Sequence, residues 1–171
     1  IDVQMNSING GSFSVTAAKN ISKLKANTPV INWMLKQEDD MQLNTPKPYR
    51  DFEERVFKHR DNLKELITSL VKDGKKVFGY GASTKGNVLL QFCNFTTKEI
   101  PYIAEVNEEK FGKFTPGTNI PIISEDEAKK MKPDYFIVFP WHFRDGILSR
   151  EKQFIKDGGK FIFPLPEIEI V

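Results

Sequence analysis

The residues best suited to bind a ligand lie in the stretch 75–90, which reads KKVFGYGASTKGNVLL. An apolar run is followed by glycines and by a Ser-Thr-Lys-Gly turn, after which apolar residues recur at helical spacing, so that a strand, a tight turn and a helix are predicted. Glycine lets a backbone approach a ligand closely, Ser83 or Thr84 can cap the helix, and Lys85 adds a positive charge. Because the N-terminus of a helix attracts anions, we expect this turn to bind phosphate or a similar group.

Neither of the common nucleotide-binding signatures is complete in this stretch. A G-x-G-x-x-G motif would need glycine at position 84, where the chain has Thr84, and a P-loop would need four residues between its first glycine and the Gly-Lys pair. A plain turn that uses its glycines only for packing therefore stays open beside the binding interpretation.

The elements around the turn alternate between strand and helix. Strands are predicted to begin with the run at 77 and to follow at 100–106, 120–123, 135–139 and 160–163, with helices at 49–72, 85–95, 125–132 and 143–157. Strands that are apolar throughout and alternate with helices indicate a mainly parallel sheet covered on both faces. The predicted fold class is α/β, with a doubly wound sheet of five strands.

Acidic and basic side chains are expected at the edge of this sheet where the strands end, because ligands of such folds bind there. Glu105 ends the second strand, at a place where an acidic side chain commonly accepts hydrogen bonds from ribose hydroxyls. The loop 107–119 contains Lys110 and Lys113, and its length exceeds that of a usual connection, which is typical of functional loops.

Two aromatic side chains, Trp141 and His142, directly follow the fourth predicted strand. Their types are suited to stacking on a ring and to hydrogen-bonding a polar ligand. Packing of Trp141 on the next helix remains the alternative. Nothing in the sequence pairs His142 with a carboxylate or a nucleophile, so we expect it to bind a ligand and not to catalyse.

The first part of the chain has a different pattern. Short strands are expected at 1–4 and 12–17 around Asn9-Gly10-Gly11, and a helix is expected to begin at Thr28 and to end before Pro46. A lone hairpin is marginally stable, so we expect it to be the edge of a larger sheet and the chain to be a piece of a longer protein.

The composition narrows the classes of function. The chain has 171 residues, 25 Lys and Arg against 23 Asp and Glu, and no basic block interleaved with aromatics, so nucleic acid is not an expected partner. No apolar run is long enough to span a membrane, and no secretory pattern is present. The single Cys93 and two histidines leave little from which to build a metal site, and the composition favours a cytoplasmic location.

Several short motifs in one order resemble the C-terminal domain of the nucleotide-sugar C-methyltransferases, a family that depends on S-adenosylmethionine. The motifs are GGS at 10–12, GYGA at 79–82, KG at 85–86, LL at 89–90, KFG at 110–112, PGT at 116–118, IPI at 120–122, Trp141, GGKFI at 158–162 and PLP at 164–166. The sequence departs from the family pattern at Asn9, where His is usual, at Glu105, where Asp is usual, at His142, where Asn is usual, and at Gly146, where Glu is usual.

The resemblance implies where the domains of the chain begin and end, and which domain binds which ligand. Residues 1–18 resemble the last strand pair of a methyltransferase domain, 19–48 a linker with a short helix, and 49–171 a Rossmann-like C-terminal domain. In the family, a zinc-binding domain and a domain that binds S-adenosylmethionine precede this one, and the sugar nucleotide lies between the central and C-terminal domains. The resemblance therefore implies that this fragment holds no cofactor, carries no catalytic residue and is inactive alone.

Two classes of function follow. In the first, the domain binds a nucleotide-diphosphate sugar, with the diphosphate at the Gly79–Gly86 turn, Glu105 on a ribose or sugar hydroxyl, and Trp141 and His142 on the base or sugar. The full set of predicted binding residues is Gly79, Tyr80, Gly81, Ala82, Ser83, Lys85, Gly86, Glu105, Pro116, Thr118, Trp141 and His142. In the second, the domain is a non-catalytic module that binds another nucleotide such as NAD, or packs against its neighbour with an empty site.

Overall fold

The computed structural model describes the backbone of residues 1–171 and every side chain except that of Asn9, so the departure from the family pattern at Asn9 lies outside the described side chains. The chain forms two compact units, Ile1–Val56 and Phe57–Val171, and each is described by itself. Within the described residues, no helix is both long enough and apolar enough to cross a membrane.

The first unit consists of a hairpin and helical segments. Strands β1 (Asp2–Asn6) and β2 (Ser12–Thr16) pair antiparallel around a short helical turn, η1 (Ile8–Gly10), which confirms the predicted hairpin. Helix α1 (Thr28–Asp40) has proline in its first turn and no buried residue. The two strands form a sheet of their own, so the expectation that the hairpin is the edge of a larger sheet stays a prediction.

Helix α2 (Lys47–Lys72) belongs to both units, and its second half packs on the sheet of the second unit. Leu63 and Ile67 are fully buried there, at the spacing that places them on one helix face. The helix is followed by Gly74, whose φ of 76° is a conformation that glycine adopts without steric strain. The N–H of Gly74 donates to the carbonyl of Val71.

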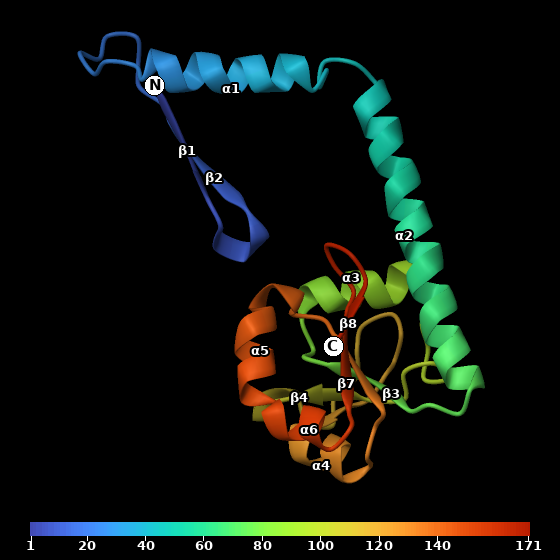
Figure 1. Cartoon of the computed structure of the whole chain (residues 1–171). Coiled ribbons are helices and arrows are strands. Elements are labelled where there is room, and N and C mark those ends of the chain that lie inside the picture. Colours follow the sequence, from blue (N-terminus) through green and yellow to red (C-terminus); the bar gives the residue numbers. More distant parts are fainter. The chain divides into compact units, whose positions relative to one another are not determined.

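The second unit is built on a six-stranded sheet, of which β3, β4, β7 and β8 are labelled in Figure 1. The strands are β3 (Val77–Tyr80), β4 (Ile103–Glu105), β5 (Ile122–Ser124), β6 (Tyr135–Val138), β7 (Lys160–Phe163) and β8 (Glu169–Ile170), in the order β5-β4-β3-β6-β7-β8. All pair parallel except β8, which is antiparallel to β7. The predicted mainly parallel α/β sheet is confirmed, whereas the predicted number of five strands is wrong, because β8 has only two residues and no apolar run that would reveal it.

The helices of the second unit connect these strands. They are α3 (Thr84–Phe92), η2 (Glu108–Lys110), α4 (Glu125–Lys130), η3 (Trp141–Phe143), α5 (Arg144–Arg150) and α6 (Lys152–Lys156). A single helix over 143–157 was expected, but the chain breaks at Glu151, whose φ of −99° and ψ of 22° are not helical. The cause is the side chain of Glu151, which is only 4 % exposed and is held by ion pairs with Lys129 and Arg150.

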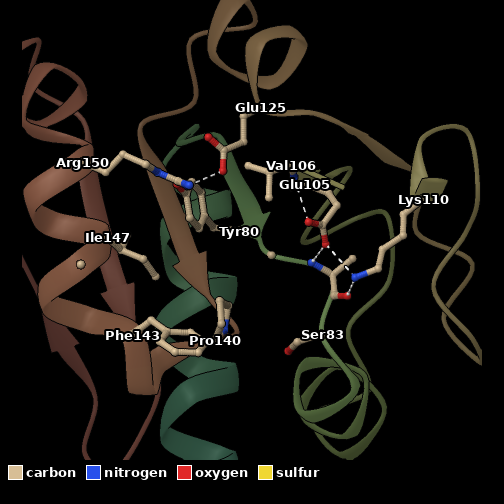
Figure 2. Close-up of a pocket in the computed structure, with 13 residues that line it drawn as sticks. Tyr80, Ser83, Glu105, Val106, Lys110, Glu125, Pro140, Phe143, Ile147 and Arg150 are labelled. Carbon is tan, nitrogen blue, oxygen red and sulfur yellow. Dashed lines mark hydrogen bonds and ion pairs between the residues drawn. The ribbon is translucent and has the colours of Figure 1, made fainter. Parts of the chain in front are cut away.

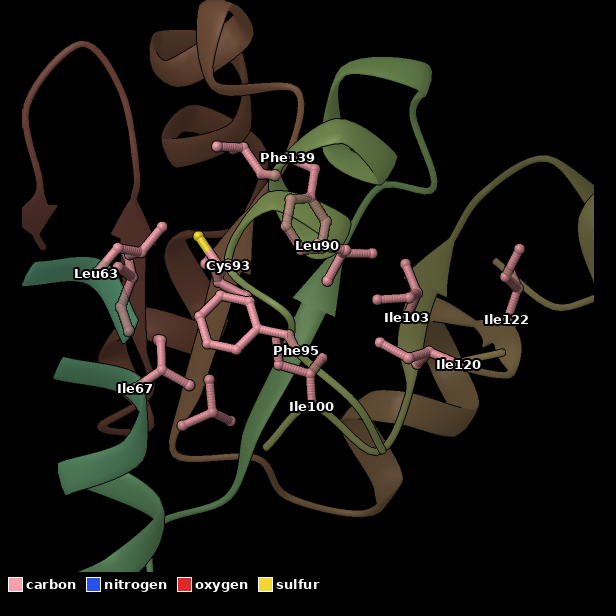
Figure 3. Close-up of a cluster of buried hydrophobic side chains, with 14 residues drawn as sticks. Leu63, Ile67, Leu90, Cys93, Phe95, Ile100, Ile103, Ile120, Ile122 and Phe139 are labelled. Carbon is pink, nitrogen blue, oxygen red and sulfur yellow. The ribbon is translucent and has the colours of Figure 1, made fainter. Parts of the chain in front are cut away.

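Two apolar layers hold the sheet, one on each face. Val77 and Ile137 point to the layer that includes α2 and α3, and Phe78 and Phe136 point to the layer that includes α4, α5 and α6. Figure 3 shows the first layer, which includes Leu63 and Ile67 of α2, Leu90 of α3 and side chains of the sheet. Successive strand residues alternate between the layers, as the pleat of a strand requires.

The order of the strands places a change of direction between β3 and β6. The chain moves from β3 to β4 and β5 on one side, and it then crosses to β6 and β7 on the other. In open α/β sheets, ligands bind beyond the carboxyl ends of the strands at such a point. The residues that follow β3 and β6 are therefore the first place to look for a site.

Candidate functional site

The turn between β3 and α3 has the predicted form. Ser83 is the N-cap of α3, and its hydroxyl accepts a hydrogen bond of 3.0 Å from the N–H of Gly86. Gly81 has a φ of 82°, and a Cβ at this position would lie 2.7 Å from the ring of Pro140. The turn therefore needs glycine at position 81 both for its conformation and for its contact with the loop after β6.

Gly79 and Gly86 lack side chains for a different reason. A Cβ on Gly79 would lie 2.3 Å from the side chain of Ile103, and a Cβ on Gly86 would lie 2.5 Å from that of Phe139. These two glycines allow strand, helix and sheet to approach closely. Packing thus accounts for two of the predicted binding glycines, although the turn that they shape still lies at the ligand edge.

Glu105 joins this turn to the loop after β4 through its carboxylate. Its Oε2 accepts from the N–H of Ala82 at 2.9 Å and from Nζ of Lys110 at 3.1 Å, and its Oε1 accepts from the N–H groups of Val106 and Asn107 at 2.8 and 3.0 Å. A carboxylate has about four acceptor positions, so these donors use all of them. The side chain is 6 % exposed. Glu105 consequently has no acceptor left for the ribose hydroxyl that its position in the sequence suggested.

Lys110 completes the connection from the other side. Its ammonium donates to Glu105 and, at 2.9 Å, to the carbonyl of Ala82 (Figure 2). Burial raises the pKa of Glu105, but the hydrogen bond from the N–H of Asn107, that from Lys110 and that from the N–H of Val106 outweigh it, so that the pKa lies below its ordinary value. Glu105 is therefore ionised at neutral pH, and its contacts with Lys110 and the backbone fix the two loops to each other.

A cavity of about 380 Å³ lies at the carboxyl ends of β3, β4 and β6, and Figure 2 shows the side chains around it. It is lined by Tyr80, Gly81, Ala82, Ser83, Glu105, Val106, Lys110, Glu125, Pro140, Phe143, Gly146, Ile147 and Arg150. Five of the predicted binding residues, from Tyr80 to Ser83 and Glu105, are among them. The structure therefore brings the glycine turn, the end of β4 and the loop after β6 together around one space.

One end of this cavity is a network of charges. The hydroxyl of Tyr80 donates to Glu151 at 3.0 Å and accepts from Arg150, and Nη2 of Arg150 also donates to Glu125 at 2.6 Å. Burial and then the neighbouring carboxylates raise the pKa of Tyr80 far above its ordinary value, although the hydrogen bond from Arg150 opposes this, so the phenol stays protonated. Tyr80 holds Arg150 and Glu125 in place at the cavity.

A second cavity, of about 500 Å³, adjoins the first at the start of α3. Both cavities are lined by Ala82, Ser83 and Lys110, and the second also reaches Lys113 and Pro116. The amide of Gln91 donates to the carbonyl of Pro116 at 3.0 Å, which positions that loop on α3. The N-terminus of a helix and two lysines thus face one space, which is a favourable environment for an anion.

Thr118, another predicted binding residue, has a structural partner. Its hydroxyl lies 2.6 Å from that of Thr115, which in turn accepts from the N–H of Ile120. Thr118 lines neither of the two cavities. Its side chain stabilises the turn of the loop after β4.

Trp141 and His142 lie at the sheet edge but line neither cavity. Trp141 is partly buried and packs against both apolar layers, and Nζ of Lys85 lies 5.8 Å from the centre of its ring. Burial and then the charge of Lys85 lower the pKa of His142, which favours the neutral imidazole. Lys85 thus lies beside Trp141 and His142 at the sheet edge, outside the two cavities.

Among the residues that the structure describes, no three His, Cys, Asp or Glu side chains come together in a way that could hold a metal ion. The expectation that this part of the protein holds no cofactor stays a prediction.

Comparison with known proteins agrees with this architecture. A family model described as the C-methyltransferase C-terminal domain matches residues 7–166. The chain belongs to this family. It is also similar to the C-methyltransferase NovU of Streptomyces niveus, with 36 % identity over 171 residues, which are 100 % of this chain and 40 % of that protein.

The family membership confirms the resemblance inferred from the motifs. The chain spans less than half the length of this relative, so the domain described here corresponds to one part of a longer enzyme in that case. Activity and substrate of the whole protein are matters for the proposal below.

Several cavity residues of the C-methyltransferase C-terminal domain were not among the predicted site residues: Glu125, Pro140, Phe143, Ile147 and Arg150. Pro140 and Phe143 flank the predicted pair of Trp141 and His142, so a search one residue further in each direction would have found them. Glu125 and Arg150 carry no such signal, because they meet only through the packing of α4 beside α5.

Proposed function

We propose that this domain binds the nucleotide-diphosphate sugar substrate of an S-adenosylmethionine-dependent sugar C-methyltransferase. The sheet is Rossmann-like and doubly wound in this proposal, and the diphosphate lies at the Gly79–Gly86 turn. One observation carries the proposal: the start of α3, Lys110 and Lys113 face a cavity that shares Ala82 and Ser83 with the cavity at the sheet edge.

The charges fit a diphosphate. A helix N-terminus supplies N–H groups and the positive end of a dipole, and ammonium groups supply further donors. Lys113 is exposed and has no carboxylate partner among the described residues, whereas Lys110 is paired with Glu105. Lys113 is therefore free to neutralise a phosphate, and Lys110 contributes mainly by holding the turn in place.

The individual predicted residues take unequal parts. Gly81, Ala82 and Ser83 line the proposed phosphate path, and Glu105 positions the turn without touching the ligand. Trp141 and His142, beside Lys85, are proposed to contact the sugar end. In this proposal the residues of this chain bind and orient the substrate, while S-adenosylmethionine and zinc belong to domains that precede this one.

The relative supports this assignment. NovU is named a C-methyltransferase, and the whole of this chain aligns with part of it at 36 % identity. The preceding methyltransferase domain is the proposed partner.

Substitution of the lysines tests the phosphate site. Lys113→Ala should weaken binding of a nucleotide-diphosphate sugar by about 1–3 kcal/mol, the range for loss of a charge-assisted hydrogen bond. Lys98→Ala is the matched control, because Lys98 is exposed and lines neither cavity. Equal affinities of Lys113→Ala, Lys98→Ala and the wild type in calorimetry would place the diphosphate elsewhere.

A further inference from the structure

The cavity at the sheet edge has apolar walls. Val106 and Phe143 are 58 % and 62 % exposed, and Ile147 is 7 % exposed, and these side chains line the space together with Pro140. Such walls offer contact area to a flat, apolar surface. They offer no partners to the hydroxyl groups that surround a sugar, which would lose their hydration there.

One end of the same cavity is polar. Arg150 uses Nε and Nη2 for its contacts with Glu151, Tyr80 and Glu125, which leaves Nη1 to donate to a ligand. Glu125 accepts from Arg150 through Oε1 and from Lys129, at 3.4 Å, through Oε2. Since a carboxylate has about four acceptor positions, Glu125 can still accept from a ligand. A donor and an acceptor therefore stand side by side.

A ligand that fits this space has two apolar faces and an edge with both hydrogen-bond donors and acceptors. Nucleobases have this combination, because their rings stack on apolar side chains while their edges carry N–H groups, ring nitrogens and carbonyl oxygens. The volume of about 380 Å³ is within the range of small-molecule sites.

We infer that this cavity receives the base of the nucleotide, between Val106 on one side and Pro140, Phe143 and Ile147 on the other. The inference rests on the proposed function. The base edge faces Arg150 and Glu125, and the diphosphate leaves the cavity at Ala82 and Ser83 toward the start of α3. This orientation directs the sugar away from the cavity, so base and diphosphate supply most of the affinity and the sugar remains accessible for chemistry.

Gly146 allows a direct test. It lines the cavity within α5, its φ is not positive, and a Cβ there would meet no atom within 4 Å, so the fold has room for a side chain. Gly146→Phe should fill the cavity and lower the affinity for the nucleoside diphosphate at least tenfold. Ser149→Phe adds the same ring to an exposed position of the same helix, outside the cavity, and should bind as the wild type does.

Nuclear Overhauser effects provide an independent measurement that needs no substitution. Protons of the bound base should show intermolecular effects to the methyl groups of Val106 and Ile147. The nucleoside diphosphate should bind nearly as tightly as the nucleotide sugar, and sugar 1-phosphate, which lacks the base, should bind equally to the wild type and to Gly146→Phe.

The outcomes separate the two proposals. If Gly146→Phe binds the nucleotide sugar as tightly as the wild type does, or if the effects arise at other methyl groups, the base lies elsewhere while the proposed function stands. If the wild type binds no nucleotide sugar, the proposed function fails and this inference fails with it.

Discussion

At the scale of single residues, Glu105 shows how a side chain at a ligand edge can serve the site without touching the ligand. Its position at the end of β4 is the one from which acidic residues commonly reach ribose. Its carboxylate instead accepts from three backbone N–H groups and from Lys110. The sequence could predict the position and type of this residue, but not that its acceptors are all occupied, because this depends on the path of two loops.

Glu105→Gln tests this positioning role. The amide would present an NH₂ group to backbone donors and would lose the ion pair with Lys110, so we expect a loss of about 1–3 kcal/mol in the free energy of unfolding at pH 7, measured by urea denaturation. Glu108→Gln, which removes the same charge from an exposed position of the same loop, should change stability little.

The difference in unfolding free energy between the wild type and Glu105→Gln should depend on pH. The pKa of Glu105 in the folded protein is lower than the ordinary value of 4.5, so its ionised form contributes stability above about pH 4.5, and this contribution is lost as the pH falls through the folded pKa. The wild type and Glu105→Gln should therefore approach each other in stability as the solution is acidified. A difference that stayed constant down to pH 3 would contradict the role assigned to the ionised carboxylate.

At the scale of elements, the strand, turn and helix at 77–92 were predictable because apolar periodicity, glycine and a capping serine all favour the same structure. The packing roles of Gly79 and Gly86 could not be predicted. A Cβ at these positions would meet Ile103 and Phe139, which are distant from them in the sequence. The break at Glu151 and the short strand β8 were missed on similar grounds: tertiary ion pairs cause the first, and pairing with β7 defines the second.

Gly86→Ala tests the packing of α3 on the sheet. The added methyl would lie 2.5 Å from Cβ of Phe139, and we expect the overpacking to lower the unfolding free energy by about 1–3 kcal/mol. Gly146→Ala, in a helix with open space around the new Cβ, should raise stability by about 0.5–1 kcal/mol. Thermal unfolding of both variants measures these changes, which should have opposite signs. A Gly86→Ala variant as stable as the wild type would show that α3 can move away from Phe139.

At the scale of the whole molecule, the family membership and the geometry agree with the proposed role in substrate binding. The chain matches a C-methyltransferase C-terminal domain over residues 7–166 and covers 40 % of its relative NovU. Our account gives this part the task of holding the base and diphosphate of the substrate. In this account the start of α3 binds the diphosphate, and the apolar cavity next to it binds the base.

Titration calorimetry of the purified chain tests this central claim most directly. A panel of uridine, thymidine, guanosine and cytidine diphosphate sugars would be compared with NAD under one set of conditions. The account predicts saturable binding of at least one nucleotide sugar, at one site per chain and with higher affinity than NAD. Binding of NAD alone, or of none of these compounds, would contradict it.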